Sequence, residues 1–224
     1  MKKVKKSNRN SFIYSNSLII VFALLFAIFQ IGQIIMGHKE YNDFLTTHHQ
    51  PSISIYHYLF SGHFIQSTFE NWESEFFQMG LFVVFTIFLR QKGSSESKEI
   101  GKEDESDKEP QSHKDAPWPV LKGGWILSIY KYSLSIALFL LFILSFIAHW
   151  YGSLKDQNMK NTLELKPQVS AIEYIKDSRF WFESFQNWQS EFLSVMVLVF
   201  LSIYLRQIGS PQSKAVDSSH DEYK

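Results

Sequence analysis

The chain has 224 residues, with 22 basic and 22 acidic side chains and no formal net charge. Neutrality argues against a nucleic-acid-binding protein, which would carry a basic field, and 21 phenylalanines argue against a disordered chain. The absence of cysteine excludes disulfides, thiol nucleophiles and thiolate metal sites. The mean hydropathy of -0.12 suits a soluble protein, but the apolar residues gather in long runs, so this average describes no single segment.

The first apolar run, at residues 18–36, predicts a transmembrane helix. A bilayer core of roughly 30 Å is crossed by about 20 apolar residues in an α-helix. The basic start of the chain resembles that of a signal peptide. However, the run is longer than the roughly 7–15 residues of a signal-peptide core, and no small-residue cleavage site follows it. We therefore expect a retained helix behind a basic cytoplasmic tail at residues 1–16.

Three further apolar runs follow, at residues 76–89, 126–150 and 192–205. The middle run is long enough to cross a membrane, whereas the other two need polar residues in their outer turns to reach about 20 residues. On length alone the short runs also fit amphipathic helices in a soluble core, but the clear spans beside them favour crossing. Residues 99–132 are highly charged, and we expect them to form a flexible cytoplasmic linker and the entrance to the third span.

The chain contains an internal duplication. Shifting it by 116 positions aligns residues 17–98 with residues 133–214 without a gap, and 29 of 82 positions are identical. Each copy supplies two spans, which makes the repeats parallel, and residues 215–224 remain as a C-terminal tail. The predicted fold is therefore all-α, an integral membrane four-helix bundle made of two tandem parallel-repeat helical hairpins.

The distribution of lysine and arginine predicts the orientation in the membrane. The amino-terminal tail carries five basic residues, the first inter-helix loop only Lys39, and the central linker begins with Arg90 and Lys92. Because basic residues favour the cytoplasmic side, we expect both termini and the linker there. The second inter-helix loop disagrees, with five basic residues, although four acidic residues accompany them.

The duplication places one acid and one amide twice within the expected spans. Asn71 and Glu75 share a helix face, and so do Asn187 and Glu191, because residues four apart lie on one side of a helix. Acids at this depth are costly unless they meet a partner, a proton or a cation. The two acids could handle protons or cations at the repeat interface, or the polar residues could cap and hydrogen-bond the helices. We favour the structural interpretation.

Four residues near the span ends have a simpler expected role. Side chains of tryptophan and arginine often anchor helices at the membrane interface, which is the role we assign to Trp72, Arg90, Trp188 and Arg206.

Histidines gather in the first inter-helix loop, where imidazoles could bind a metal ion or sense acidity. No metal signature is present and the second copy does not keep these residues, so we predict neither a metal site nor a cofactor. The histidines concerned are His38, His48, His49, His57 and His63. His149 aligns with Gln33 and is expected to be a packed polar residue. No catalytic motif is found, so we do not expect an enzyme.

One motif occurs twice, as Ser-Glu-Phe followed by Leu-Arg-Gln-x-Gly-Ser-x-x-Ser-Lys, at residues 74–98 and 190–214. It resembles a bacterial integral membrane family known only as a domain of unknown function. The resemblance implies a multi-pass protein of the bacterial cytoplasmic membrane, and it supplies no substrate, cofactor or catalytic residue.

The sequence thus predicts a membrane protein with a structural or partner-interaction role. The alternative is a small proton- or cation-handling transporter or channel that uses Glu75 and Glu191. The expected partner is the lipid bilayer. A protein partner or a homo-oligomer stays open, and no nucleic acid is expected.

Overall fold

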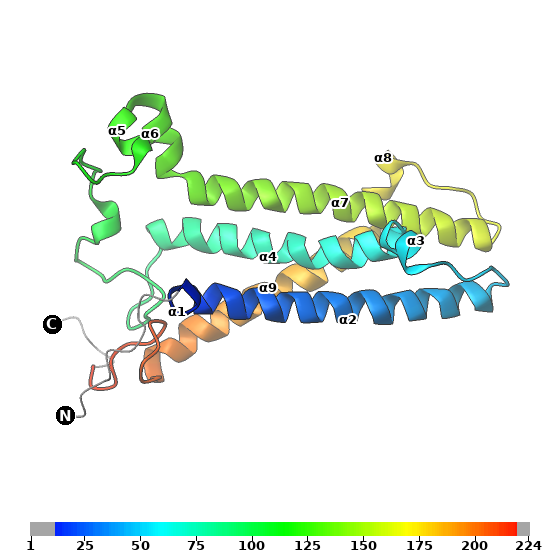
Figure 1. Ribbon diagram of the computed structural model, residues 1–224, viewed down its shortest axis with the longest axis horizontal. Helices are drawn as coiled ribbons and strands as arrows, with labels where there is room; N and C mark the ends of the chain where they lie inside the picture. The colour runs from blue at the N-terminus through cyan, green and yellow to red at the C-terminus, as the bar shows by residue number, and fades with distance from the viewer. Residues whose placement is uncertain (1–11, 219–224) are drawn as a thin grey trace.

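The computed structural model describes residues 12–218, so residues 1–11 and 219–224 of the two predicted tails lie outside the described part. Within this range the chain has helices and loops and no strand, which confirms the predicted all-α class. The four long helices in Figure 1 are α2 (Ser17–Thr47), α4 (Gly62–Phe88), α7 (Ser133–Leu163) and α9 (Ser178–Tyr204). The short elements are α1 (Phe12–Ser15), α3 (Ile55–Leu59), the 3₁₀ helix η1 (Glu105–Asp107), α5 (Trp118–Lys122), α6 (Gly124–Lys131) and α8 (Ala171–Tyr174).

Two of the described helices, α2 and α7, are long and apolar enough to cross a membrane. Each has 31 residues, which is about 46 Å of helix at 1.5 Å rise per residue. The helices α4 and α9 have 27 residues each and carry acids and amides in their first halves. Crossing by all four long helices therefore stays a prediction.

The long helices recur along the chain at one spacing. Both α7 and α9 begin and end 116 residues after α2 and α4, respectively. Local contacts recur with them. The Asn42 amide donates to the Ile53 carbonyl and accepts from the Ile53 N–H, and Asn158 makes the same two bonds with Val169. One side-chain amide thus ties each loop to the helix before it.

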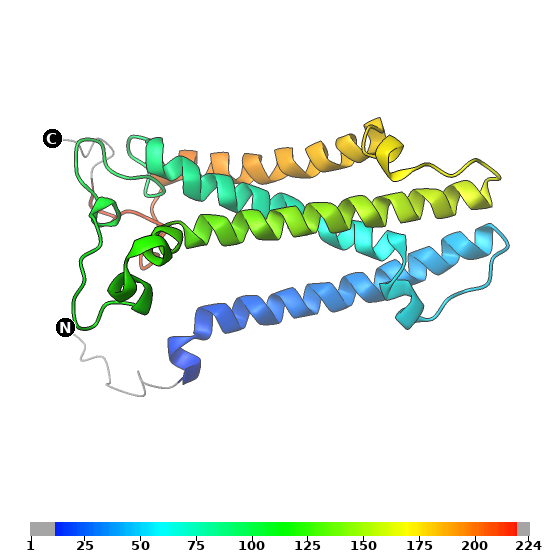
Figure 2. The ribbon, with the colours of Figure 1, turned by 90° about the horizontal axis from the view of Figure 1, so that it is seen from above.

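The central helix of the bundle is α4, which lies between α7 and α2 in Figure 1, whereas α9 and α2 lie on opposite sides of the bundle in Figure 2. Helix α4 packs along α7 and along part of α9, whereas α2 touches it at few points. A Cβ atom at Gly62 would lie 2.7 Å from the Gly152 carbonyl oxygen, and one at Gly152 would lie 2.5 Å from the Gln66 backbone nitrogen. The positions 116 residues away hold Ser178 and Met36, and α9 and α2 lie apart. Of these two helix pairs, α4 and α7 come into backbone contact at Gly62 and Gly152, whereas α2 and α9 do not. A side chain at either glycine would keep α4 and α7 apart.

The bundle buries polar side chains and exposes apolar ones. Most of the large fully buried side chains among the described residues are polar, and they are Glu73, Ser74, His149, Ser153, Asp156 and Ser184. All four long helices expose large apolar side chains, such as Phe29, Phe85, Leu140 and Leu198. A soluble protein shows the opposite preference in its core, and extended apolar surface marks contact with a membrane or a protein.

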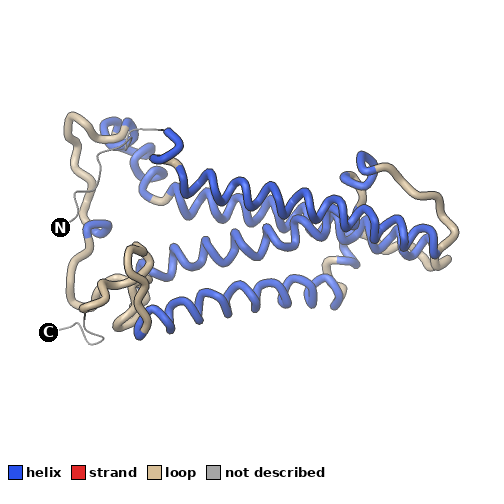
Figure 3. The backbone as a smooth tube through the Cα atoms, turned by 60° about the horizontal axis from the view of Figure 1, so that its bottom comes forward, coloured by secondary structure: helices blue, strands red, loops and turns tan. Residues whose placement is uncertain are grey.

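The two ends of the bundle differ in what they carry. The connections at residues 48–54 and 164–170 lie at one end together with α3 and α8 (Figures 1 and 3). Residues 89–132 and 205–218 lie at the opposite end, beside α1. The described start and end of the chain therefore share one end of the bundle with the linker.

Candidate functional site

Ionisable side chains from three helices meet inside the bundle. They are Glu70 and Glu73 on α4, His149 on α7 and Glu183 on α9, and we call them the acid–histidine cluster. Residues three or four apart lie on one helix face, so the two acids of α4 project together towards the contact with α7 and α9. The packing of α4 against both helices brings the four side chains together.

The innermost members are Glu73 and His149, whose side chains are both 0% exposed. The Nδ1 atom of His149 lies 2.8 Å from Oε2 of Glu73, and the other oxygen of Glu73 accepts a hydrogen bond of 2.9 Å from the Trp188 indole. Both oxygens of this carboxylate are therefore satisfied. The His149 Nε2 atom is buried without a hydrogen-bond partner. A buried polar nitrogen without a partner costs free energy, so this atom marks a place that favours a ligand or a proton.

The outer members are Glu70 and Glu183. One ring nitrogen of His149 and one carboxylate oxygen from each of these acids all lie within 4.8 Å of one another. The Asn187 amide donates to Glu70. The Glu183 carboxylate accepts 2.9 Å hydrogen bonds from the Gln66 amide and from Arg179 Nε, which forms an ion pair with it.

The cluster carries more negative than positive charge. Three carboxylates face one guanidinium, that of Arg179, and a histidine that is charged only when protonated. Away from water, neighbouring carboxylates repel one another and disfavour their common ionisation. The arrangement therefore favours uptake of a proton or another cation.

The cluster opens towards the end of the bundle that holds α3 and α8. Side-chain exposure falls from 45% at Arg179 to 16% at Glu183 and to 0% at His149. Ser153 and Tyr174 are buried and continue the hydrogen-bond network inside the bundle, because the Ser153 hydroxyl donates to Glu183 at 3.3 Å and lies 2.5 Å from the Tyr174 hydroxyl. Burial raises the pKa of the Tyr174 phenol. Because the Ser153 hydroxyl donates to Glu183, the Tyr174 hydroxyl is the donor in its bond with Ser153.

Aromatic rings close the other side of the cluster. The Phe77 ring lies one helical turn beyond Glu73, and its centroid is 4.8 Å from the centroids of both Phe142 and Trp188. The site is thus a buried group of polar side chains with one polar approach.

Comparison with known proteins gives a family but no activity. The family described as Domain of unknown function (DUF6766) matches residues 9–224. The chain belongs to this family. No curated protein and no solved structure matches it. Membership of DUF6766 confirms the resemblance to a domain of unknown function, and it assigns no reaction, substrate or partner.

The acids singled out from the sequence of this DUF6766 protein, Glu75 and Glu191, lie close together beside the acid–histidine cluster. Their carboxyl groups come within hydrogen-bonding range of each other between α4 and α9. Glu75 is exposed at the bundle surface, as is Asn71, whose amide donates to the Ser67 carbonyl at 2.8 Å. Of the four predicted polar residues, only Asn187 contacts the cluster.

The four expected interface anchors have different surroundings. Trp72 packs against Phe26 and Phe69 at the α2–α4 contact. Trp188 lies inside the bundle as the hydrogen-bond donor to Glu73. Arg90 and Arg206 each donate to three carbonyls at the ends of α4 and α9. The two arginines thus close their helix ends in the same way.

The loop histidines bond to their own neighbours. His38 lies 2.7 Å from the Ile53 carbonyl, His57 lies 2.8 Å from the Ser54 hydroxyl, and His63 lies 3.1 Å from the Tyr58 hydroxyl. His48 lies 2.9 Å from the Phe44 carbonyl, and His49 has a positive φ of 58° at the helix end. In the described part of the chain, the metal-capable group of three side chains is Glu70, His149 and Glu183.

Sequence reasoning missed the acid–histidine cluster because it looked for residues kept in both copies. The positions 116 residues from Glu70, Glu73, His149 and Glu183 hold Gln186, Gln189, Gln33 and Ser67. The helical spacing of polar residues was the available signal. Polar side chains recur every three or four residues at 66, 70 and 73, at 145, 149 and 153, and at 179, 183 and 187.

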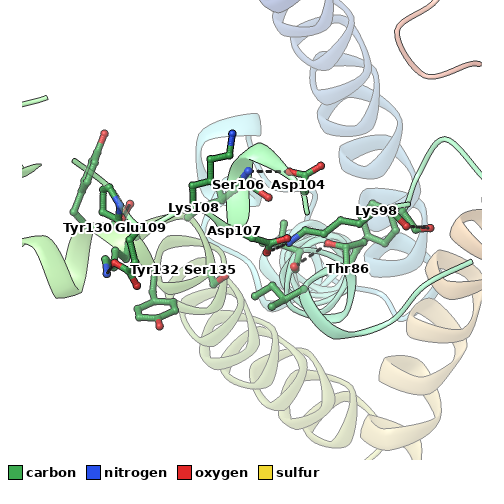
Figure 4. A pocket seen from close by; sticks show the side chains of 18 of the residues that line it. Thr86, Lys98, Asp104, Ser106, Asp107, Lys108, Glu109, Tyr130, Tyr132 and Ser135 are labelled. Atoms are coloured by element: carbon green, nitrogen blue, oxygen red, sulfur yellow. Dashed lines mark hydrogen bonds and ion pairs between the residues drawn. The ribbon is translucent and has the colours of Figure 1, made fainter. Parts of the chain in front are cut away.

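A cavity lies at the opposite end of the bundle, between the linker and the ends of α4 and α7 (Figure 4). It has a volume of about 1010 Å³ and is lined by charged linker residues and by Thr86 and Ser135. Its charges are largely matched within the cavity: Lys98 pairs with Asp107, and Lys131 pairs with Glu109 at 2.6 Å. Because the charges are paired and solvated, we place the candidate site at the buried cluster.

Proposed function

We propose that this DUF6766 protein is a multi-pass membrane protein in which α2, α4, α7 and α9 all cross the bilayer. The apolar outer surface and polar interior of the bundle support this arrangement, because lipid favours apolar surface. Helices of 27 residues reach about 40 Å, which exceeds the roughly 30 Å of a bilayer core. Their polar first halves would lie in the outer part of the membrane, with Glu70, Glu73 and Glu183 turned towards the other helices.

The proposed topology puts both termini and the linker in the bacterial cytoplasm. Support comes from the basic amino-terminal tail and from the shared end of the bundle at which the linker and the described chain ends lie. The common spacing of 116 residues between helix bounds supports an origin by tandem duplication. In this topology the acid–histidine cluster opens towards the outer face of the membrane.

We propose that the protein handles cations at the acid–histidine cluster and catalyses no reaction. The observation that carries this proposal is the fully buried Glu73–His149 pair beside Glu70 and Glu183, with Arg179 as the paired guanidinium. Ionisable residues inside a membrane are costly, and they usually mark a proton or ion site. The sequence suggested cation handling by Glu75 and Glu191 as an alternative. The proposal keeps this function and assigns it to the acid–histidine cluster instead.

The test is ion flux into liposomes that contain the purified protein. We expect an internal pH dye or cation dye to report uptake with the wild type. We expect the variants Glu73→Gln and Glu183→Gln to fall to the level of protein-free liposomes, because each removes one carboxylate of the cluster. The matched control is Glu75→Gln/Glu191→Gln, which removes two nearby acids outside the cluster. Equal flux in wild type and protein-free liposomes would contradict a transport role. Loss of flux in the control alone would move the site to Glu75 and Glu191.

A structural or partner-interaction role is the second candidate, and the position of α2 favours it. This helix is apolar, touches the rest of the bundle at few points, and exposes side chains such as Leu24 and Ile28. Such a surface suits lipid, a protein partner or a second copy of the chain. If cross-linking in native membranes left the protein at the mass of a monomer, this second role would be contradicted.

A further inference from the structure

We infer that Glu70, His149 and Glu183 bind one divalent transition-metal ion, with Zn²⁺ as the reference ion. This inference rests on the proposed cation-handling function and names the class of cation. It concerns a binding site, so it can be tested without any measurement of transport.

The donor atoms already lie close enough for this role. Two carboxylate oxygens and one imidazole nitrogen fall within 4.8 Å of one another, from three different helices. Ligands that share a Zn²⁺ ion at about 2.0–2.2 Å lie roughly 3–4 Å apart, so small side-chain rotations would complete the site. Three protein ligands leave a coordination position open, as in sites where a metal exchanges water or other ligands.

The histidine has the hydrogen bonding of a metal ligand. Its Nδ1 atom is held by Glu73 at 2.8 Å, and its Nε2 atom is buried without a partner. When Nδ1–H donates to a carboxylate, Nε2 carries the lone pair that a metal needs. Metal-bound histidines commonly donate their other N–H to a carboxylate, which fixes the ring and makes it more basic. Trp188 completes this support by donating to the second oxygen of Glu73.

The two carboxylate ligands are also held in place. Asn187 donates to Glu70, and Gln66 and Arg179 donate to the two oxygens of Glu183. The Oε2 atom of Glu183 accepts from both Gln66 and Ser153, whereas Oε1 accepts from Arg179 and keeps a lone pair for a metal. Glu70 also keeps free lone pairs, so these bonds orient the acids and still allow metal binding. A divalent ion together with Arg179 would balance the charges of Glu70, Glu73 and Glu183. Nitrogen and oxygen donors without any thiolate suit zinc, manganese, iron or cobalt in their divalent states.

The test is titration calorimetry with ZnCl₂ on the full-length protein in detergent, with metal content measured after dialysis. We expect one Zn²⁺ per chain in the wild type and loss of that binding in His149→Gln and Glu183→Gln. The His149→Gln variant introduces the residue found at the related position, Gln33. Glu73→Gln removes the carboxylate that orients His149, so we expect about 10–100-fold weaker binding.

Two variants serve as matched controls. His57→Gln removes an exposed imidazole and Glu191→Gln removes a nearby acid, and neither residue belongs to the three ligands. Both should bind Zn²⁺ as the wild type does. Visible absorption of bound Co²⁺ gives a second readout. It uses only the wild type, so it remains valid if a variant fails to fold. Co²⁺ should show a bound spectrum that one equivalent of Zn²⁺ abolishes.

The outcomes separate this inference from the proposed function. No Zn²⁺ binding and no bound Co²⁺ spectrum in the wild type would overturn the metal site. Binding that survives in both His149→Gln and Glu183→Gln would overturn it as well. If proton flux then still depended on Glu73, the cation-handling function would stand without the metal. Metal binding with the expected variants, but without flux, would support the site and contradict transport.

Discussion

At the scale of single residues, the acid–histidine cluster places charges where they are expensive. Glu73 and His149 lie 2.8 Å apart with no exposed side-chain surface, and each satisfies part of the other's hydrogen-bonding capacity. A buried pair of hydrogen-bonded ionisable groups adds little stability overall, but the loss of one partner leaves the other uncompensated. The pair is therefore a sensitive point for stability as well as a candidate for function.

This asymmetry predicts a double-mutant result. We expect Glu73→Ala to destabilise the folded protein by about 3–5 kcal/mol, because it leaves the His149 and Trp188 donors without their acceptor. The double variant Glu73→Ala/His149→Ala should cost less than the sum of Glu73→Ala and His149→Ala, since either single change already removes the hydrogen bond between the two residues. Unfolding in a mixed-micelle denaturant titration measures these values. Additive single and double effects would show that the two residues do not interact.

The candidate site could be predicted only in part from the sequence. Glu75 and Glu191 drew attention because both copies keep them, and the structure does bring these two acids together. The cluster itself is made by residues that the two copies do not share, such as His149 against Gln33. The cluster forms because α7 and α9 pack against α4. Helical periodicity shows which residues share a face, but it does not show which helices become neighbours.

At the scale of helices, the pair α4 and α7 is the tightest contact and holds the cluster in register. The glycines that permit it are Gly62 and Gly152. The backbone of α7 faces Gly62, and the Gln66 backbone nitrogen and the Ile65 side chain of α4 face Gly152, so neither position has room for a side chain. Small residues are the usual means by which helices approach closely in membranes. Loss of this contact would separate His149 from Glu73.

Two glycine variants test this contact, because one should lower the free energy of unfolding and the other should not. Gly152→Ala places a Cβ 2.5 Å from the Gln66 nitrogen, so we expect a loss of about 1–3 kcal/mol from overpacking. Gly32→Ala on α2 meets nothing within 4 Å and should be neutral, or stabilising by up to about 1 kcal/mol through helix propensity. The same denaturant titration measures both. A Gly152→Ala variant as stable as Gly32→Ala would contradict the close packing of α4 on α7.

At the scale of the whole molecule, the sequence predicted the four long helices better than their packing. The apolar run at residues 18–36 lies within α2, which continues through polar residues to Thr47. The short helices α3 and α8 were not predicted, because one or two turns depend on local caps, such as Ser54 and Ser170, and on packing. Residues 99–132, expected to form a linker and the entrance to the third span, contain the short helices η1, α5 and α6. Lys98, just before this segment, pairs with Asp107 inside it.

The packing departs from two-fold symmetry because the two copies differ in side-chain size at single positions. A symmetric bundle would pack α9 on α2 as it packs α4 on α7. The related positions, Ser178 and Met36, carry side chains where Gly62 and Gly152 have none, and α2 lies apart. An alignment of the two copies predicts the same helices in each copy. It does not show that replacing glycine by serine or methionine changes which helices pack together.

The central claim is that all four long helices cross the membrane, since the cost of burying the acid–histidine cluster follows from it. The chain has no cysteine, so single cysteines can report which side each loop occupies. The direct measurement labels His49→Cys, Leu165→Cys and Glu103→Cys in intact cells with a membrane-impermeant maleimide. We expect the first two to react from outside and Glu103→Cys to react only after permeabilisation. If only α2 and α7 cross, residues 49 and 165 would lie on opposite sides, and that result would contradict the account.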